Sequence, residues 1–81
     1  MTDSIFTESY ERFCNLLIAA RKAKGLTQVD LAARLGRPQS FVSKYERGER
    51  RLDVIEFLEV TRAMGVDPLK MIRSLDVADG A

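Results

Sequence analysis

The sequence predicts an all-α fold, a single compact domain of five helices over residues 1–81 with a core at about 7–75 and loose ends at 1–5 and 76–81. No stretch alternates apolar and polar residues at the two-residue period of a strand. Apolar residues instead recur at spacings of three and four, and capping residues and glycines divide the chain into five segments. A chain of 81 residues buries only a limited core, so assembly into an oligomer would help to stabilise it.

The first helix is expected to begin after Thr7, a good N-cap residue, with Glu8 in its first turn. Gly25 marks its end. The residues of this segment that form an apolar stripe at helical spacing are Tyr10, Phe13, Leu17 and Ala20.

Thr27 is a natural N-cap for a short second helix, which Gly36 breaks. Its inward-facing residues are expected to be Leu31, Ala32 and Leu35. Pro38 fits an early position of a third helix, which we expect to end at about Glu46 or Arg47, before Gly48. The side chains that this third helix buries are expected to be Val42 and Tyr45.

Asp53 and Glu56 have the spacing of a capping box and predict the start of a fourth helix, which ends at Met64-Gly65. Asp67-Pro68 opens a fifth, shorter helix. The core-facing residues of the fourth helix are expected to be Val54, Phe57, Val60, Thr61 and Met64.

Ile55 and Leu58 lie on a neighbouring stripe of the fourth helix and exceed what one core face needs. Apolar patches of this kind usually mark contact sites. We therefore expect a homodimer interface made by Ile55 and Leu58, extended by Leu69 and Ile72 of the fifth helix. A wider intramolecular core is the alternative.

Composition argues against several classes of protein. The chain has no apolar run near 18 residues and no signal-peptide pattern, so neither a membrane span nor export is supported, and a cytoplasmic location is expected. Cys14 is the only cysteine and there is no histidine, so we expect no disulfide, metal or cofactor. No glycine-rich loop or paired-carboxylate motif stands out, so we expect neither an enzyme nor a small-molecule substrate.

The net charge of +1 is unevenly distributed. Residues 21–51 carry nine basic side chains against three acidic ones, a surplus of six, whereas both flanking segments are acidic. A basic face on a nearly neutral body suits docking onto DNA. A solvated charged surface explains the charge alone equally well.

Gln28 and Gln39 open the second and third helices, with the Leu35-Gly36 turn between them. Two helices joined by a tight, glycine-containing turn can present one helix to the major groove of DNA while the other spans the backbone. On the third helix, the side chains that face away from Val42 and Tyr45 are Gln39, Ser40, Ser43 and Lys44. We expect these side chains to be free to contact base edges. The alternative for each serine and for the lysine is a solvated surface residue without a role in binding.

Four segments together resemble the lambda-repressor-like family of helix-turn-helix regulators, also called the Cro/C1 or XRE type. They are Gly25-Leu26-Thr27-Gln28, Leu31-Ala32-x-x-Leu35-Gly36, Ser40-x-Val42-Ser43-Lys44-Tyr45-Glu46-Arg47-Gly48 and Ala63-Met64-Gly65-Val66. The resemblance covers about residues 9–73. It implies a compact five-helix DNA-binding domain whose recognition helix, at about residues 38–46, lies in the major groove.

The resemblance also implies roles for individual residues. Gln28 would bond a phosphate and support Gln39, whose amide matches the N6 and N7 atoms of adenine. Arg21 and Glu46 would form a structural ion pair between the first and third helices. Ser40 would contact a base edge, and Lys44 would contact either guanine or a phosphate. Further phosphate contacts are expected from Arg47, Arg50 and Arg51.

Three positions depart from the family pattern, namely Arg37, Phe41 and Leu52. Arg37 replaces an apolar turn residue and either contacts a phosphate or is simply solvated. Phe41 stands where a small polar residue is common, and it either meets a thymine methyl group or packs on the flank of the third helix. Leu52 replaces a frequent proline.

The sequence thus predicts a dimeric transcriptional regulator, a repressor by preference, that binds double-stranded DNA at an operator with two-fold symmetry. Phage repressors and restriction–modification controller proteins of similar size fit this reading equally well. The alternative is a protein-interaction module, such as an antitoxin, that grips a partner protein through the apolar stripe of the fourth helix.

Overall fold

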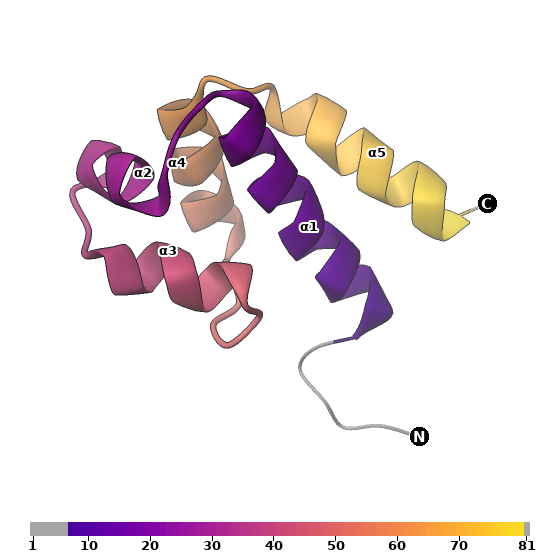
Figure 1. The fold of residues 1–81 in the computed structure, drawn as a ribbon. Helices are drawn as coiled ribbons and strands as arrows, with labels where there is room; N and C mark the ends of the chain where they lie inside the picture. The colour runs from indigo at the N-terminus through magenta and orange to yellow at the C-terminus, as the bar shows by residue number, and fades with distance from the viewer. Residues whose placement is uncertain (1–6, 81) are drawn as a thin grey trace.

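The structure is a computed structural model that describes the backbone of residues 7–80 and the side chains of residues 7–77 (Figure 1). Within this range it contains five helices and no strand. They are α1 (Glu8–Ala23), α2 (Gln28–Leu35), α3 (Gln39–Glu46), α4 (Val54–Met64) and α5 (Pro68–Gly80). The predicted all-α architecture of five helices is confirmed.

The predicted caps position the helix starts. Thr7 Oγ1 accepts a hydrogen bond from the amide of Tyr10 at 3.2 Å. Thr27 and Asp30 form a reciprocal capping box at 3.0 and 2.9 Å, and Asp53 and Glu56 form another at 2.7 and 3.1 Å. Each box satisfies amide groups that a helix start would otherwise leave without partners.

The turn between α2 and α3 depends on Gly36, which has a φ of 67°. In that left-handed conformation the amide of Arg37 donates to the carbonyl of Ala32 at 3.0 Å and closes the C-terminus of α2. An added Cβ would meet no atom within 4 Å, so glycine is needed here for its backbone conformation and not for space. Pro38 is the N-cap of α3 and not its first helical residue.

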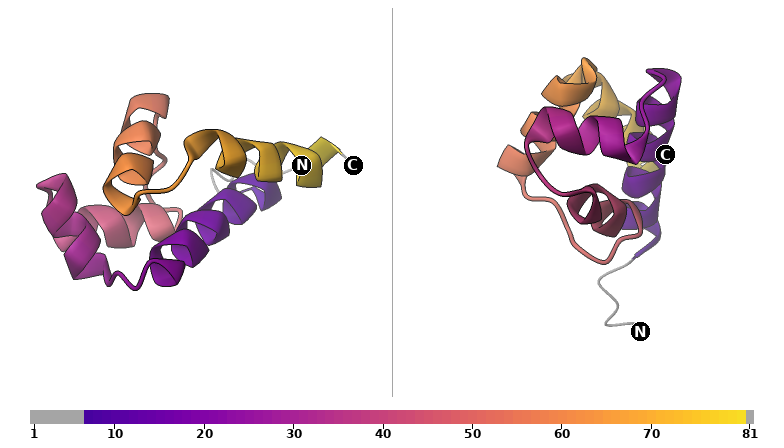
Figure 2. Two further views of the ribbon diagram at one scale, coloured as in Figure 1. Left: turned by 90° about the horizontal axis from the view of Figure 1, so that it is seen from above. Right: turned by 60° about the vertical axis from the view of Figure 1, so that its left-hand side comes forward.

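The core lies where α1, α2, α3 and α4 converge. Its least exposed members come from all four helices and include Leu17, Leu31, Val42, Tyr45 and Val60. Figure 2 shows α2, α3 and α4 grouped at one end of the molecule, while α1 and α5 run side by side away from them. The α2–α3 pair is therefore packed against α1 and α4, which hold it in a fixed orientation.

Two expectations require correction. Val54 is 72% exposed and does not reach the core, because it occupies the first helical position after the Asp53 cap.

Residues 76–80 were expected to be loose, yet α5 continues to Gly80. Leu75 is half-buried and lines a groove with Leu16 of α1, so the part of α5 that precedes these residues packs beside α1. Residues 1–5 lie outside the described part of the chain. No helix among the described residues is long and apolar enough to cross a membrane.

Candidate nucleic-acid interface

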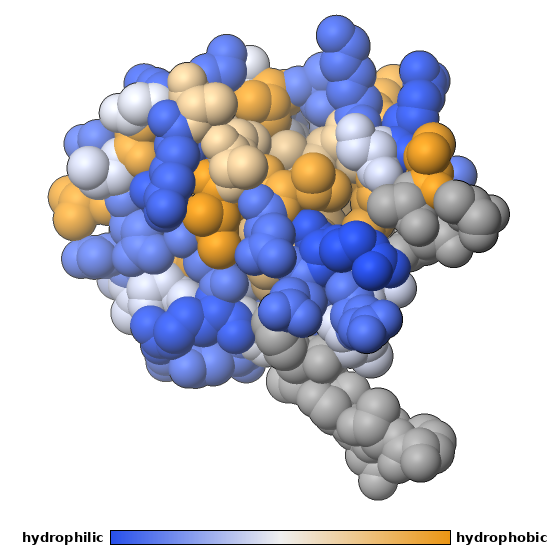
Figure 3. All heavy atoms as spheres, turned by 45° about the vertical axis from the view of Figure 1, so that its right-hand side comes forward, coloured by the Kyte–Doolittle hydropathy of each residue, from blue (hydrophilic) through white to orange (hydrophobic). Residues whose placement is uncertain are grey.

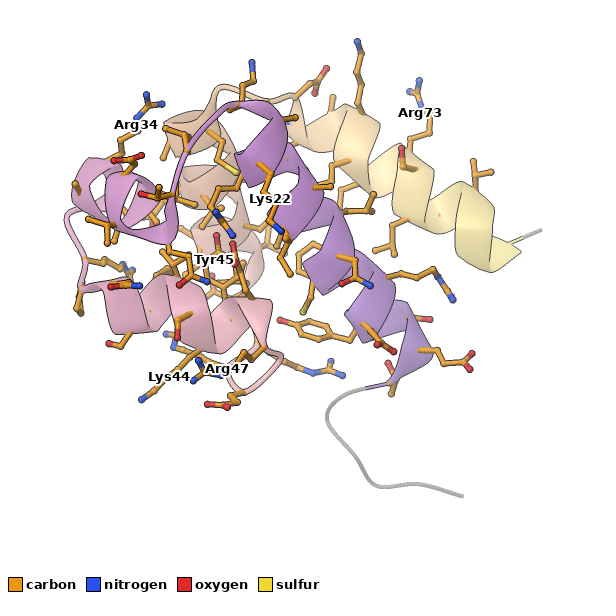
Figure 4. All side chains as sticks on the ribbon, in the orientation of Figure 1. Lys22, Arg34, Lys44, Tyr45, Arg47 and Arg73 are labelled. Carbon is orange, nitrogen blue, oxygen red and sulfur yellow. The ribbon has the colours of Figure 1, made fainter. Side chains whose placement is uncertain are left out.

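The α3 helix divides into a buried face and an exposed face. Val42 and Tyr45 are completely buried, whereas Gln39, Ser40 and Lys44 are exposed. Figure 4 shows Lys44 and Arg47 on the side of α3 that faces away from the body of the molecule. The exposed side chains thus form a polar and basic surface along one helix.

A chain of four polar side chains runs from α1 to the start of α3. Gln39 Nε2 donates to Gln28 Oε1 at 3.3 Å, and Gln28 Nε2 donates to Glu46 Oε1 at 2.9 Å. Glu46 also accepts two hydrogen bonds from Arg21, at 2.8 Å from Nε and 3.1 Å from Nη2. The exposed amide of Gln39 is therefore linked through Gln28 to a buried ion pair.

That ion pair is the one the family resemblance implies. Arg21 and Glu46 are 8% and 7% exposed, and Arg21 Nη1 also donates to the carbonyl of Leu26 at 2.9 Å. The hydrogen bonds to Glu46 raise the pKa of Arg21 above its usual value. A bidentate arginine–carboxylate pair has fixed geometry, so it ties α1 to the C-terminal end of α3.

The arginines after α3 are paired with carboxylates. Arg47 bonds both oxygens of Glu49, with the closer contact at 2.9 Å, and donates to Ser43 Oγ at 2.7 Å. Arg50 binds both oxygens of Glu56 at 2.7 and 2.9 Å, and this pairing lowers the pKa of Glu56 to about 2. The predicted capping role of Glu56 is confirmed, but its pairing with Arg50 was not foreseen from the sequence.

Arg51 packs over the ring of Tyr10 with its guanidinium carbon 4.4 Å from the ring centre. The Tyr10 hydroxyl accepts a hydrogen bond from the amide of Leu52 at 3.0 Å. The loop that follows α3 is therefore fastened to α1 at two neighbouring residues.

Phe41 does not lie on the exposed face of α3. Its ring is 8% exposed and makes an edge-on contact with Tyr45 at 5.4 Å. The guanidinium groups of Arg37 and Arg50 lie 4.3 and 5.0 Å from the ring centre. The expected contact of Phe41 with a thymine methyl group is thus corrected in favour of packing, because two arginines and the core enclose the ring.

Arg37 has an intramolecular role in addition to any contact with DNA. Besides covering Phe41, its guanidinium lies 3.7 Å from Glu56 and 3.6 Å from Glu59, both on α4. These distances are long for salt bridges, and the side chain is one-third exposed. The arginine therefore links the turn before α3 to α4 without being fixed there.

The residues expected at a dimer interface differ in exposure. Ile55, Leu69 and Ile72 are 63%, 71% and 45% exposed, so they offer apolar surface. Leu58 is half-buried and packs against the core cluster. Leu58 therefore contributes to a wider intramolecular core, as the alternative prediction had it, and only its exposed part is left for a dimer interface.

A separate apolar groove lies between α1 and α5, and Figure 3 shows hydrophobic residues on this face bordered by hydrophilic ones. Its volume is about 260 Å³, and it is lined by Arg12, Asn15, Leu16, Ser74 and Leu75.

Within the described part of the chain, no three cysteine, aspartate or glutamate side chains cluster as a metal site would require. Cys14 is buried and its thiol donates to the carbonyl of Tyr45 at 3.3 Å, and burial raises the pKa of that thiol.

Comparisons with known proteins agree with this geometry. Residues 17–71 match a protein-family model described as Helix-turn-helix. The HTH-type transcriptional regulator y4dJ of Sinorhizobium fredii (strain NBRC 101917 / NGR234) is 39% identical over 56 residues, which cover 69% of this chain and 73% of that protein.

Two solved structures share both sequence and fold with the chain. The XRE-family like protein from Pseudomonas syringae pv. tomato str. DC3000 is 54% identical, with a TM-score of 0.83 and coverage of 86% of this chain and 85% of that one. The restriction-modification controller protein C.AhdI from Aeromonas hydrophila is 31% identical, with a TM-score of 0.73 and coverage of 80% and 98%.

Proposed function

Because this chain belongs to the Cro/C1-type, or XRE-type, helix-turn-helix family of DNA-binding transcriptional regulators, we propose that it binds a specific sequence in double-stranded DNA. It does so as a homodimer on an operator with two-fold symmetry, with one α3 in each major groove. The half-sites then lie about one helical turn, ~34 Å, apart. Repression is the preferred outcome, because a bound dimer excludes other proteins from the DNA that it covers.

The observation that carries this proposal is the combination of exposure and fixed position at the N-terminal turn of α3. Gln39 and Ser40 are exposed, yet Gln39 is held by its contact with Gln28. A side chain that reads a base edge must be accessible and must also be oriented before it docks. The start of α3 meets both conditions.

Base edges are contacted by Gln39, Ser40, Ser43 and Lys44 in this proposal. Ser43 Oγ accepts from Arg47, so its hydroxyl hydrogen is available to a base acceptor. Phe41 is left out because it is buried. The phosphate contacts are assigned to Gln28, Arg37, Arg47, Arg50 and Arg51. Gln28 uses one amide hydrogen on Glu46 and keeps the second for a phosphate.

Binding can be measured by fluorescence anisotropy on a site selected from random DNA, over a series of salt concentrations. The affinity is expected to fall steeply with salt, because several phosphate contacts release counterions. Gln39→Ala is expected to weaken specific binding by roughly fivefold or more and to leave non-specific binding nearly unchanged. Lys70→Ala, an exposed change on α5, is the matched control. Equal specific affinity for wild type and Gln39→Ala would contradict the role of Gln39.

The exposed apolar residues Ile55, Leu69 and Ile72 also support a second candidate, a module that grips another protein. Size-exclusion chromatography with light scattering separates the two proposals. A dimer that Ile55→Lys converts to a monomer supports the regulator. A stable wild-type monomer favours an external protein partner for this surface.

A further inference from the structure

We propose that Glu46, although it cannot touch DNA, determines which base Gln39 reads by fixing the direction of the hydrogen bonds that run from the ion pair to Gln39. Glu46 is thus a specificity-determining positioning residue. The inference deepens the proposed function and rests on α3 entering the major groove.

The direction of the chain follows from which groups can donate. An arginine side chain only donates hydrogen bonds, and an ionised carboxylate only accepts them. Arg21 occupies both oxygens of Glu46, and the atom of Gln28 that lies 2.9 Å from Glu46 Oε1 must then be its nitrogen. The oxygen of Gln28 is left to face Gln39, so the atom of Gln39 that bonds it, at 3.3 Å, must also be a nitrogen.

This direction limits what Gln39 can offer a base. One of its two amide hydrogens is used on Gln28, which leaves one donor and the carbonyl oxygen for the groove. Adenine presents one acceptor, N7, and one donor, the N6 amino group, whereas guanine presents two acceptors, N7 and O6. The fixed amide therefore matches adenine. If the amide were turned over, both hydrogens would be free and guanine would be favoured.

Burial makes the constraint strong. Glu46 is 7% exposed, so water cannot readily replace its partners Arg21 and Gln28 or reverse the direction of those hydrogen bonds. Gln28 is half-buried between Glu46 and Gln39 and transmits the constraint to the exposed residue. Specificity at the surface is in this way set by a charge in the interior.

Glu46→Gln removes the constraint, because the new amide can direct either its oxygen or its nitrogen toward Gln28. Each of the two directions loses one hydrogen bond from Arg21, so neither direction is preferred. Gln28 and therefore Gln39 can then adopt either amide orientation. At the base position that Gln39 reads, the wild type is expected to prefer adenine over guanine by a factor between roughly five and a hundred. In Glu46→Gln this preference is expected to fall until both bases bind about equally.

Combining Glu46→Gln with Gln28→Glu provides a rescue. A carboxylate at position 28 can only accept, so it again obliges Gln39 to donate its nitrogen. The double variant is expected to restore the adenine preference, while its affinity for every sequence falls because the new charge repels phosphate. A purely structural role for Glu46 does not predict that a second substitution restores base preference.

The test is binding-site selection from random DNA, followed by anisotropy on the chosen site with adenine or guanine at each position. Gln39→Ala identifies the position that Gln39 reads. Gln28→Ala, which leaves the Arg21–Glu46 pair intact, covers the case in which Glu46→Gln does not fold, and it is also expected to relax the preference. Circular dichroism establishes that each variant is folded. A retained wild-type preference in folded Glu46→Gln or Gln28→Ala, or a failed rescue, would overturn the proposal.

Nuclear magnetic resonance of the free protein distinguishes failure of this inference from failure of the proposed function. The chain has only two glutamines and one asparagine, so its side-chain amide spectrum is simple. Glu46→Gln is expected to shift the amide signals of both Gln28 and Gln39, and Ser40→Ala serves as a control that leaves the chain of contacts intact. Unshifted Gln39 signals would refute the relay whatever happens on DNA. Shifted signals in a protein that selects no DNA sequence would refute the proposed function instead.

Discussion

The chain uses the arginine–carboxylate pair in two regions, and the pairs differ chiefly in burial. The side chains of Arg21 in α1 and Glu46 at the end of α3 are 10% and 4% exposed, while those of Arg47 and Glu49 beyond α3 are each 55% exposed. Both pairs are bidentate, with closest distances of 2.8 and 2.9 Å. Distance therefore does not distinguish them. In the interior a pair fixes one arrangement, because losing a partner leaves a charge without water.

At the surface the same contact is easily exchanged. Water and salt compete with an exposed ion pair, which contributes little to folding. In the proposed complex with DNA, a phosphate would replace Glu49 on Arg47 at little cost, because that pair is exposed. The buried pair thus sets geometry, and the exposed pairs supply replaceable charge.

Removing one partner of the buried pair should give the largest effect. Arg21→Met leaves Glu46 buried without its counterion, and we expect a loss of about 3–5 kcal/mol in the free energy of unfolding, measured with urea. The double variant Arg21→Met with Glu46→Leu should recover most of this loss, because no charge then remains buried. A loss below about 1 kcal/mol for Arg21→Met would show that the two pairs are energetically alike.

Glu56 lies between the two extremes, since its side chain is 13% exposed and it serves both Arg50 and the α4 cap. Glu56→Ala should cost about 1 kcal/mol or more at pH 7, because it removes both the capping hydrogen bond and the ion pair with Arg50. The pKa of Glu56 is lowered from 4.5 to about 2 in the fold, so its stabilising effect is present above pH 4.5. That effect is lost as the pH falls toward 2.

Urea titrations at pH 7, 4 and 2.5 check this prediction. The stability difference between wild type and Glu56→Ala should narrow as the pH falls. Glu56→Gln retains a residue that can complete the capping box, so comparing it with Glu56→Ala separates the cap from the charge. A difference that is constant over this range would assign the whole effect to the cap.

Glu49→Gln should have the smallest effect. The pair with Arg47 is exposed, so folding stability should not change measurably. Freeing Arg47 and removing one negative charge should tighten binding to non-cognate DNA by about threefold at low salt, and high salt should abolish the gain. Anisotropy on a random duplex measures this gain. Asp76→Asn, which removes an exposed negative charge on α5 away from the proposed DNA contacts, is the control.

The starts of the helices and the ends of α1 to α4 were predictable because they depend on local chemistry. The caps at Thr7, Thr27 and Asp53 and the turn at Gly36 act within a few residues of the chain, and the sequence shows them directly. The length of α5 was not predictable in this way. Residues 76–80 carry weak local helix signals, so local chemistry indicated an earlier end than the structure has.

In the candidate site, too, some side chains could be placed from local spacing and one could not. Position along α3 sufficed to place Gln39, Ser40 and Lys44 on the outer face, since helical spacing alone separates them from Val42 and Tyr45. The same spacing left Phe41 ambiguous. Its burial depends on Arg37 and Arg50, which approach it from the turn before α3 and the loop after it.

The sequence by itself determined the helices, the turn and the family of this protein, because these follow from contacts between residues close in the chain and from motifs. The tertiary structure alone decided that Gln28 bonds Glu46, that Glu56 bonds Arg50 and that Val54 is exposed. Those contacts join different segments, and the packing of the helices sets which polar atoms come within 3 Å of each other. A hydrogen-bond direction that runs from the buried Glu46 to the exposed amide of Gln39 arises only at that level.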